Sequence, residues 1–165
     1  MRPVEIAERL RARSHDVLFA RDEVIVLVEP EALTDTLASL RDDPDLALDF
    51  LSFVTVTHQP GSVPEFWVVY ELLSSTLHHR VRVKAGTGGA TPRVPSVTGL
   101  FPTANWHERE AFDFYGVVFD GHPDLTRILL PEDWEGHPLL KTEELGGVDT
   151  RFHGAFIPPV DERTT

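Results

Sequence analysis

Apolar positions recur along the first part of the chain with two different spacings. Apolar residues three apart predict an amphipathic helix over residues 4–13. Two apolar runs, 17–20 and 24–28, flank the polar turn Arg21-Asp22-Glu23 and predict a hairpin over Asp16–Pro30. Every position of the second run is apolar, which favours a strand that is covered on both faces.

Leucines at helical spacing predict a second helix after this hairpin. They are Leu33, Leu37 and Leu40. Pro30 suits the first turn of that helix, because a missing N–H costs nothing at that position. Asp42-Asp43-Pro44 then ends it, since proline cannot continue a helix and Asp-Asp-Pro favours a turn.

Three further strands are predicted before residue 85. Phe50–Thr57 is rich in β-branched residues, and Phe66–Leu73 follows a loop that contains two prolines and a glycine. Leu77–Val83 alternates strictly between its two faces, so this strand is expected to be half exposed. The order helix, two strands, helix, three strands predicts an α+β domain of two layers. Its sheet is expected to be mixed or antiparallel, with the helices on one face.

Glycine and proline become frequent beyond this sheet. Ala85–Pro95 is rich in Gly, Pro and Thr and predicts a loop. Pro102–Tyr115 predicts a helix that ends at Gly116, because glycine is the usual residue just past a helix C-terminus. The apolar run Val117–Phe119 follows this helix.

The chain is expected to have two parts. Residues 1–119 form the α+β core domain together with the helix that ends at Gly116. Residues 120–165 form an extended, partner-binding C-terminal segment. Its final stretch, 143–165, lacks helical or strand periodicity and predicts an extended or disordered tail.

Composition excludes several classes of function. Cysteine is absent, which excludes disulfides, thiolate nucleophiles and zinc fingers and argues against an iron–sulfur cluster held by this chain alone. The net charge of −12 would repel nucleic acid and anionic lipid. No apolar run approaches the roughly 20 residues that span a bilayer, and the N-terminus is too charged for a signal peptide. We therefore expect a cytoplasmic chain that reaches a membrane only through its partners.

Two groups of residues superficially resemble ligand sites. Gly86-Thr87-Gly88-Gly89 fits neither known phosphate-binding pattern, so a flexible loop is favoured. Gly-His-Pro occurs at 121–123 and at 136–138, with Asp124 and Glu135 nearby. A His/carboxylate metal site is conceivable there, but the usual ligand spacing is missing. Histidines that lie in turns and contact backbone carbonyls are the favoured interpretation.

The helix around residue 110 carries the most unusual pattern of polar residues. Trp106, Glu110 and Asp113 are spaced to share one face. Two nearby carboxylates can act as an acid/base pair when their pKa values are driven apart. Alternatively, Glu110 and Asp113 accept hydrogen bonds from backbone N–H groups or from Arg109 and Arg127. The second interpretation is favoured, because no nucleophile, metal motif or phosphate loop accompanies the pair.

Tryptophan and other aromatic residues suggest that this part of the chain contacts a partner. The helix carries aromatic residues on more than one side, so more than one neighbour must cover it. Trp134 lies between two acidic residues in a predicted loop and is a candidate interface anchor. A tryptophan folded back onto its own domain is an equally good interpretation.

A dense block of residues carries a family resemblance. The block runs through Asn105–Gly116, Phe119–Leu125 and Arg127–Leu129, with flanks at Pro95–Thr98 and Pro131–Leu139. It resembles the signature of the C subunit of bacterial NADH–quinone oxidoreductase, the counterpart of the mitochondrial complex I 30 kDa subunit. The resemblance is dense over about forty-five residues, and the N-terminal part fits the α+β architecture of the family. Two positions depart from it: Thr126 and Leu140 stand where the family usually has basic residues.

The resemblance implies a non-catalytic accessory subunit on the cytoplasmic side of the cell membrane. It implies a place in the peripheral arm of a proton-translocating respiratory oxidoreductase, without a cofactor in this chain. NAD, FMN, iron–sulfur clusters and quinone would belong to other subunits. The implied partners are chiefly the quinone-site large subunit, which the C-terminal segment wraps, and a cluster-bearing subunit. An equivalent subunit of a membrane-bound hydrogenase, or of a ferredoxin- or deazaflavin-dependent complex, is the alternative within the same class.

The candidate functional residues are assigned to a signature and interface network, and none is assigned as catalytic, cofactor-binding or metal-binding. They are Trp106, Glu108, Arg109, Glu110, Asp113, His122, Asp124, Arg127, Trp134 and His137. The network is predicted to fix the junction that presents the C-terminal segment. The alternative from another class is a stand-alone hydrolase that uses Glu110, Asp113 and His122. That alternative predicts that the three side chains converge on a solvent-filled cleft.

Overall fold

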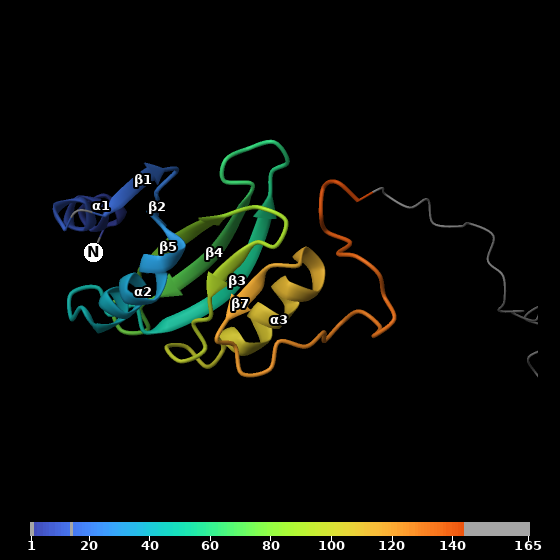
Figure 1. Ribbon diagram of the computed structural model, residues 1–165. Helices are drawn as coiled ribbons and strands as arrows, with labels where there is room; N and C mark the ends of the chain where they lie inside the picture. Colours follow the sequence, from blue (N-terminus) through green and yellow to red (C-terminus); the bar gives the residue numbers. More distant parts are fainter. Residues whose placement is uncertain (1, 14, 144–165) are drawn as a thin grey trace, which may run out of the picture.

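The computed structural model describes residues 2–13 and 15–143. The elements follow in the expected order, from an N-terminal helix to a last helix beside the sheet (Figure 1). They are α1 (Pro3–Ala12), β1 (Asp16–Ala20), β2 (Glu23–Val28), the 3-10 turn η1 (Pro30–Ala32), α2 (Leu33–Asp42), β3 (Phe50–His58), β4 (Phe66–Leu73), β5 (Arg80–Thr87), β6 (Arg93–Pro95), α3 (Ala104–Tyr115) and β7 (Val118–Asp120).

Five strands form the main sheet in the order β1-β2-β5-β4-β3. Neighbouring strands are antiparallel except for β2 and β5, which are parallel because α2, β3 and β4 separate them along the chain. A second, two-stranded sheet pairs β6 with β7 in parallel. The α+β class and the mixed sheet that were predicted from the sequence are thus confirmed.

One face of the sheet forms the core. Val26, Val83, Tyr70 and Val54 are neighbours across four strands, and each is at most 4% exposed. Side chains from all three helices join the same cluster, among them Ile6, Leu37 and Ala111. Each fully buried aliphatic side chain contributes about 1.5–3 kcal/mol. The adjacent residue on β3, Thr55, points to the other face and is exposed.

The last strand of the main sheet begins later than the sequence predicted. A turn precedes β5, in which Ser74 N donates to His79 O (2.9 Å) and His78 N donates to Ser74 O (3.1 Å). His78 takes a φ of 53° in this turn, so Leu77–His79 cannot continue a strand. The strand instead starts at Arg80.

The predicted loop at 85–95 is shorter than expected. β5 runs on to Thr87, and its Ala85 pairs with Val28 on one side and Val68 on the other. A Cβ at Gly86 would lie 2.6 Å from Pro64 Cγ, so close packing explains this glycine. Glycine content alone could not distinguish a packed strand from a flexible loop.

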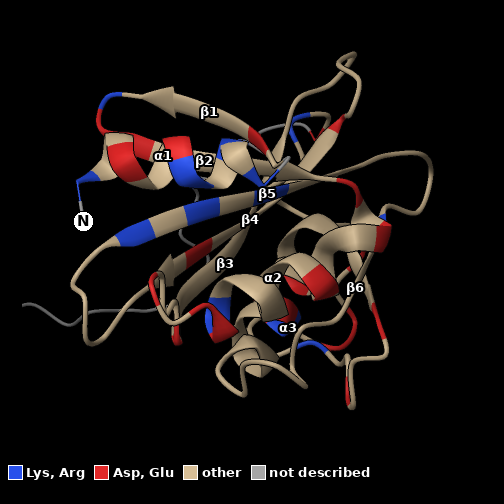
Figure 2. Cartoon of the chain, turned by 90° about the vertical axis from the view of Figure 1, so that its left-hand side faces the viewer, with Lys and Arg blue, Asp and Glu red and all other residues tan. Residues whose placement is uncertain are grey.

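Basic residues of α1 are paired with the end of α2. Arg9 and Arg13 form ion pairs with Asp43, and Arg9 also pairs with Asp45. Burial would raise the pKa of Asp43, but the Asp45 N–H and the two arginines outweigh it, so its pKa lies below the ordinary value. A similar charge pairing occurs on the sheet, where Arg82 of β5 contacts Glu71 and Glu23. Figure 2 shows basic segments along β5 and an acidic segment on the neighbouring β4.

Candidate functional site

Helix α3 buries two carboxylates. Glu108 and Asp113 are both 0% exposed, whereas Glu110, between them in sequence, is exposed. The helix ends at Gly116, which has a left-handed φ of 73° and whose N–H donates to Phe112 O (2.9 Å). Beyond β7, residues 121–143 turn back along α3, and we call them the returning segment (Figure 1). Each buried carboxylate therefore meets a different loop.

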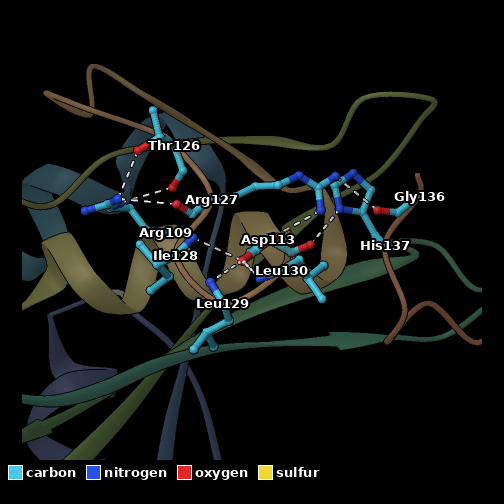
Figure 3. A network of polar contacts seen from close by, with 9 residues as sticks. All are labelled: Arg109, Asp113, Thr126, Arg127, Ile128, Leu129, Leu130, Gly136 and His137. Carbon is cyan, nitrogen blue, oxygen red and sulfur yellow. Dashed lines mark hydrogen bonds and ion pairs between the residues drawn. The ribbon is translucent and has the colours of Figure 1, made fainter. Parts of the chain in front are cut away.

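Asp113 holds the backbone of the returning segment. Its Oδ2 accepts the N–H groups of Ile128, Leu129 and Leu130 at 3.1, 2.9 and 3.0 Å, and its Oδ1 accepts Arg127 Nη1 at 3.1 Å (Figure 3). Burial would raise the pKa of Asp113, but these donors outweigh it and the pKa lies below the ordinary value. A single ionised side chain thus organises three consecutive residues that form no helix or strand.

Two further contacts attach the next part of the segment to the end of α3. Arg127 Nη2 donates to Gly136 O (3.2 Å), and His137 Nδ1 donates to Asp113 O (2.9 Å). Leu139 N donates to Phe114 O (3.2 Å), so the segment satisfies carbonyl groups that a helix C-terminus leaves free. A Cβ at Gly116 would lie 2.6 Å from the His137 ring, so glycine is required there for space as well as for its φ.

Arg109 connects α3 to the start of the returning segment. Its Nε donates to Thr126 O (3.1 Å), and its Nη2 donates to Thr126 Oγ1 (2.9 Å). The guanidinium also lies 5.0 Å from the Trp106 ring centre. A lysine or arginine side chain at position 126 could not accept the bond from Arg109 Nη2, so the threonine at this position has a local structural reason.

Glu108 holds a different loop, the one that follows β6. Its carboxylate accepts Val97 N (2.8 Å) and Ser96 Oγ (2.7 Å). Burial raises its pKa to about 7, because these two hydrogen bonds only partly offset the loss of hydration. The Tyr70 hydroxyl is buried without a partner in the described residues, and burial followed by the nearby Glu108 charge raises its pKa.

His122 occupies the space beside Glu108 as a neutral ring. Its Nδ1 accepts the Asp124 N–H (3.0 Å), so Nε2 carries the proton and donates to Asn105 O (3.2 Å). Nε2 is 3.9 Å from Glu108 Oε2. Asp124 contributes its backbone to this arrangement, while its carboxylate is exposed.

The structure does not assemble the acid/base pair considered from the sequence. Trp106 and Glu110 are exposed, but the returning segment covers Asp113, so the three do not share one open face. The expected Arg109–Asp113 pairing is wrong, because Arg127 occupies that carboxylate and Arg109 turns to Thr126. Asp113 accepts backbone N–H groups and Arg127, as the second interpretation predicted, whereas Glu110 is exposed and bonds neither Arg109 nor Arg127 in the described part of the chain.

Two members of the predicted network, both tryptophans, are exposed. Trp106 is 63% exposed and Trp134 is 46% exposed. Within residues 2–13 and 15–143, no group of three or more His, Cys, Asp or Glu side chains could hold a metal ion. In the same residues, no helix is long and apolar enough to cross a membrane.

Three residues beside Glu108 were not predicted from the sequence to belong to the site. Ser96 and Val97 were noted only as flanking sequence, and nothing local indicates that they bond a carboxylate eleven and twelve positions away. Tyr70 lies in the apolar run of β4, so its burial was expected from strand packing alone and indicated no part in the site. Only the density of polar residues around α3 marked this region in advance.

The fold and the site together define a class: a small α+β domain whose buried polar side chains organise its own loops around one helix. The chain belongs to the respiratory-chain NADH dehydrogenase 30 kDa subunit family, whose sequence profile matches residues 26–149. That match begins within β2 and covers the rest of the sheet and the network around α3.

Curated relatives and solved structures agree with this assignment. The chain is 42% identical over 157 residues to the C subunit of the NADH-quinone oxidoreductase of Mycolicibacterium smegmatis, covering 94% of this chain and 66% of that protein. It is 46% identical over 151 residues to the corresponding protein of Roseiflexus sp., covering 89% and 87%. The chain thus spans somewhat less than two thirds of several relatives it matches.

Two solved structures have a similar fold. A trypsin-resistant fragment of Nqo5 matches with a TM-score of 0.66 and 29% identity, over 76% of this chain and all of that one. A chain of an archaeal membrane-bound sulfane sulfur reductase matches with a TM-score of 0.73 over 86% and 85%, and at 22% identity it shows the fold alone.

Proposed function

We propose that this chain is a structural subunit in the peripheral arm of a complex I-type NADH:quinone oxidoreductase, on the cytoplasmic side of the membrane. Residues 120–165 act as its partner-binding segment. Its role is to hold the quinone-site large subunit and a cluster-bearing subunit in fixed geometry. NAD, FMN, iron–sulfur clusters and quinone belong to those partners, and the chain contributes no catalytic group.

One observation carries this proposal: the hydrogen-bonded network around α3 holds residues whose apolar side chains are exposed. Leu129 is 60% exposed, although its own N–H is bound to the buried Asp113. Trp106 is 63% exposed and is positioned by Arg109, which also holds Thr126. We call Trp106 and Leu129 the α3 surface. Apolar side chains on a preorganised backbone bind a partner without a large ordering cost.

The network also explains why so many buried polar groups occur without a reactive site. Asp113 and Glu108 each accept donors from their own chain, and neither carboxylate opens to a substrate. Trp134 and Leu139, at 46% and 43% exposed, extend the apolar surface along the segment. Exposed tryptophan and leucine side chains of this kind are typical of a protein interface, where aromatic anchors dominate the binding energy.

The experiment that tests the proposal is substitution on the α3 surface followed by assembly of the complete complex on native gels. Leu129→Ser is expected to reduce the recovery of intact complex roughly tenfold, as for an interface anchor. Leu18→Ser is the matched control, because Leu18 is 50% exposed on β1, at the far edge of the sheet. This control is expected to assemble normally.

Two results would contradict the scaffold role. One is normal assembly of Leu129→Ser and Trp106→Ala combined with a loss of turnover, which would assign chemistry to this surface. The other is equal loss of assembly in Leu18→Ser and Leu129→Ser, which would show that exposed leucines matter without regard to place. Thermal unfolding of each isolated variant establishes that the chain still folds.

A further inference from the structure

A cavity of about 420 Å³ lies at the C-terminal end of α3, away from Trp106 and Leu129. This volume is within the range of small-ligand pockets. The ends of β3 and β4, the loop 89–92, the last turn of α3 and residues 137–142 enclose it. The returning segment thus forms one wall, so the cavity exists only when that segment is attached.

The walls of this cavity are aromatic and carry one formal charge. Phe66, Phe112 and Tyr115 supply three rings, and Glu65 supplies the single carboxylate. No lysine or arginine side chain lines the cavity within the described part of the chain. Aromatic faces and a carboxylate together are attractive to a cation and repel an anion.

His58 fixes Glu65 in place at the cavity wall. The Lys141 N–H donates to His58 Nδ1 (2.9 Å), so the ring proton lies on Nε2, which donates to Glu65 Oε1 (3.0 Å). The His58 side chain is 2% exposed and stacks on Phe66 at 4.4 Å. Glu65 Oε2 has no partner among the described residues and remains able to accept.

His137 is the second histidine of the lining. Its Nδ1 donates to the carbonyl of Asp113, which holds the ring against the end of α3. No described residue bonds its Nε2. The N–H groups that these hydrogen bonds require on His58 and His137 are thus used within the protein, and Glu65 supplies the carboxylate of the lining.

We propose that this cavity binds the cationic side chain, arginine or lysine, of a neighbouring polypeptide. The aromatic rings contact the apolar stem and the face of the cation, and Glu65 accepts its N–H groups. A chain with a net charge of −12 is suited to a basic partner. The site is separate from the α3 surface and goes beyond the proposed function, so either can fail without the other.

The test is NMR titration of the full-length chain, observing the imidazole signals of His58 and His137. The probes are N-acetyl-arginine amide, its neutral isostere N-acetyl-citrulline amide, and methylguanidinium. N-acetyl-arginine amide is expected to shift both rings saturably with a Kd on the order of 1 mM. The citrulline probe is expected to bind roughly tenfold more weakly or not at all, because it carries no charge.

Glu65→Gln separates the cavity from the rest of the surface. Glutamine can still accept from His58, so the chain should fold, but affinity for the arginine probe should fall roughly tenfold. Glu132→Gln is the matched control, because Glu132 is exposed in the returning segment and does not line the cavity; it should leave the affinity unchanged.

Four results would overturn the proposal. They are no saturable shift of either ring, equal binding of the arginine and citrulline probes, equal binding to wild type and Glu65→Gln, and methylguanidinium binding as tightly as N-acetyl-arginine amide. The last result would assign the cavity to a small organic cation instead of a polypeptide side chain.

Discussion

The loops at Glu108 and at Asp113 show how differently one helix can use two buried carboxylates. Both side chains are 0% exposed, and they lie five positions apart on α3. Asp113 accepts three backbone N–H groups and an arginine, and its pKa is lowered. Glu108 accepts one backbone N–H and one hydroxyl, and its pKa is raised to about 7.

The difference teaches that burial alone does not decide the charge state of a carboxylate. Burial is the largest influence on both pKa values and raises each of them. What decides the outcome is the number of donors and the presence of Arg127, which is 3.1 Å from Asp113. The Asp113 loop is therefore held by an ionised carboxylate, whereas the Glu108 loop is held by a carboxyl group that can take up a proton near neutral pH.

Removing the better-bonded carboxylate has the largest expected effect. Asp113→Ala leaves three backbone N–H groups and Arg127 without their acceptor and should lower the free energy of unfolding by about 3–5 kcal/mol. Urea unfolding of the isolated chain measures this. Glu110→Ala, an exposed carboxylate on the same helix, should change the stability by less than about 0.5 kcal/mol. Equal effects of the two substitutions would break the comparison.

The pH dependence of stability should reveal the opposite ionisation of Glu108. Its folded pKa is about 7 and its ordinary value is 4.5, so its contribution is present below pH 4.5 and lost as pH rises toward 7. That rise in pKa corresponds to about 3 kcal/mol. Glu108→Gln should remove this decline when urea unfolding is repeated across pH. An unchanged decline would show that Glu108 is ionised in the folded state at acidic pH.

Asp113 provides the opposite sign in the same measurement. Its folded pKa is below 3.8, so its stabilising contribution is present above pH 3.8 and lost as pH falls through the folded pKa. Asp113→Asn should therefore flatten the acid limb of the stability curve and leave the decline between pH 4.5 and 7 in place. Loss of both features in one variant would mean that the two loops are not independent.

Arg127 should have an intermediate effect, because it connects the two parts of the returning segment. Arg127→Met keeps the apolar stem but removes the bonds to Asp113 and Gly136 O, and about 2 kcal/mol should be lost. Thermal unfolding measures the loss. Arg80→Met, on an arginine that is 66% exposed, is the control and should change stability by less than about 0.5 kcal/mol. Equal losses in the two variants would contradict the account.

The contact of His137 with the C-terminal end of α3 should contribute least to the free energy of unfolding. His137→Ala removes one hydrogen bond to Asp113 O and the contact with Gly116, and about 1 kcal/mol should be lost. Thermal unfolding again measures it. His107→Ala, one histidine on the same helix but outside the described network, should show a smaller loss. A larger loss in His107→Ala than in His137→Ala would show that His137 does not hold the returning segment against the end of α3.

The fold was largely predictable because apolar spacing carries it. Leu33 and Leu37 lie at helical spacing and are buried, and Gly116 ends α3 where a C-terminal glycine was expected. The start of β5 was not predictable, because Leu77 fits the strand alternation and only the Ser74–His79 turn excludes it. Propensity and spacing describe local structure, whereas that turn depends on a specific pair of backbone hydrogen bonds.

The site was predictable in membership but only partly in connection. Asp113 and Arg127 were both singled out, and Arg127 was named as a possible donor. Arg109 was named as another possible donor to the same carboxylate, yet Arg109 bonds Thr126 instead. Which arginine reaches a carboxylate depends on the path of residues 120–130, and no periodic pattern in the sequence describes that path.

Amide hydrogen exchange at residues 128–130 tests the central claim most directly. In the wild-type chain, the N–H groups of Ile128, Leu129 and Leu130 should exchange slowly, although they belong to no helix or strand, because Asp113 accepts all three. In Asp113→Asn they should exchange much faster, while amides of β4 keep their protection. Fast exchange of these three amides in the wild type, or equal protection in both proteins, would contradict the account.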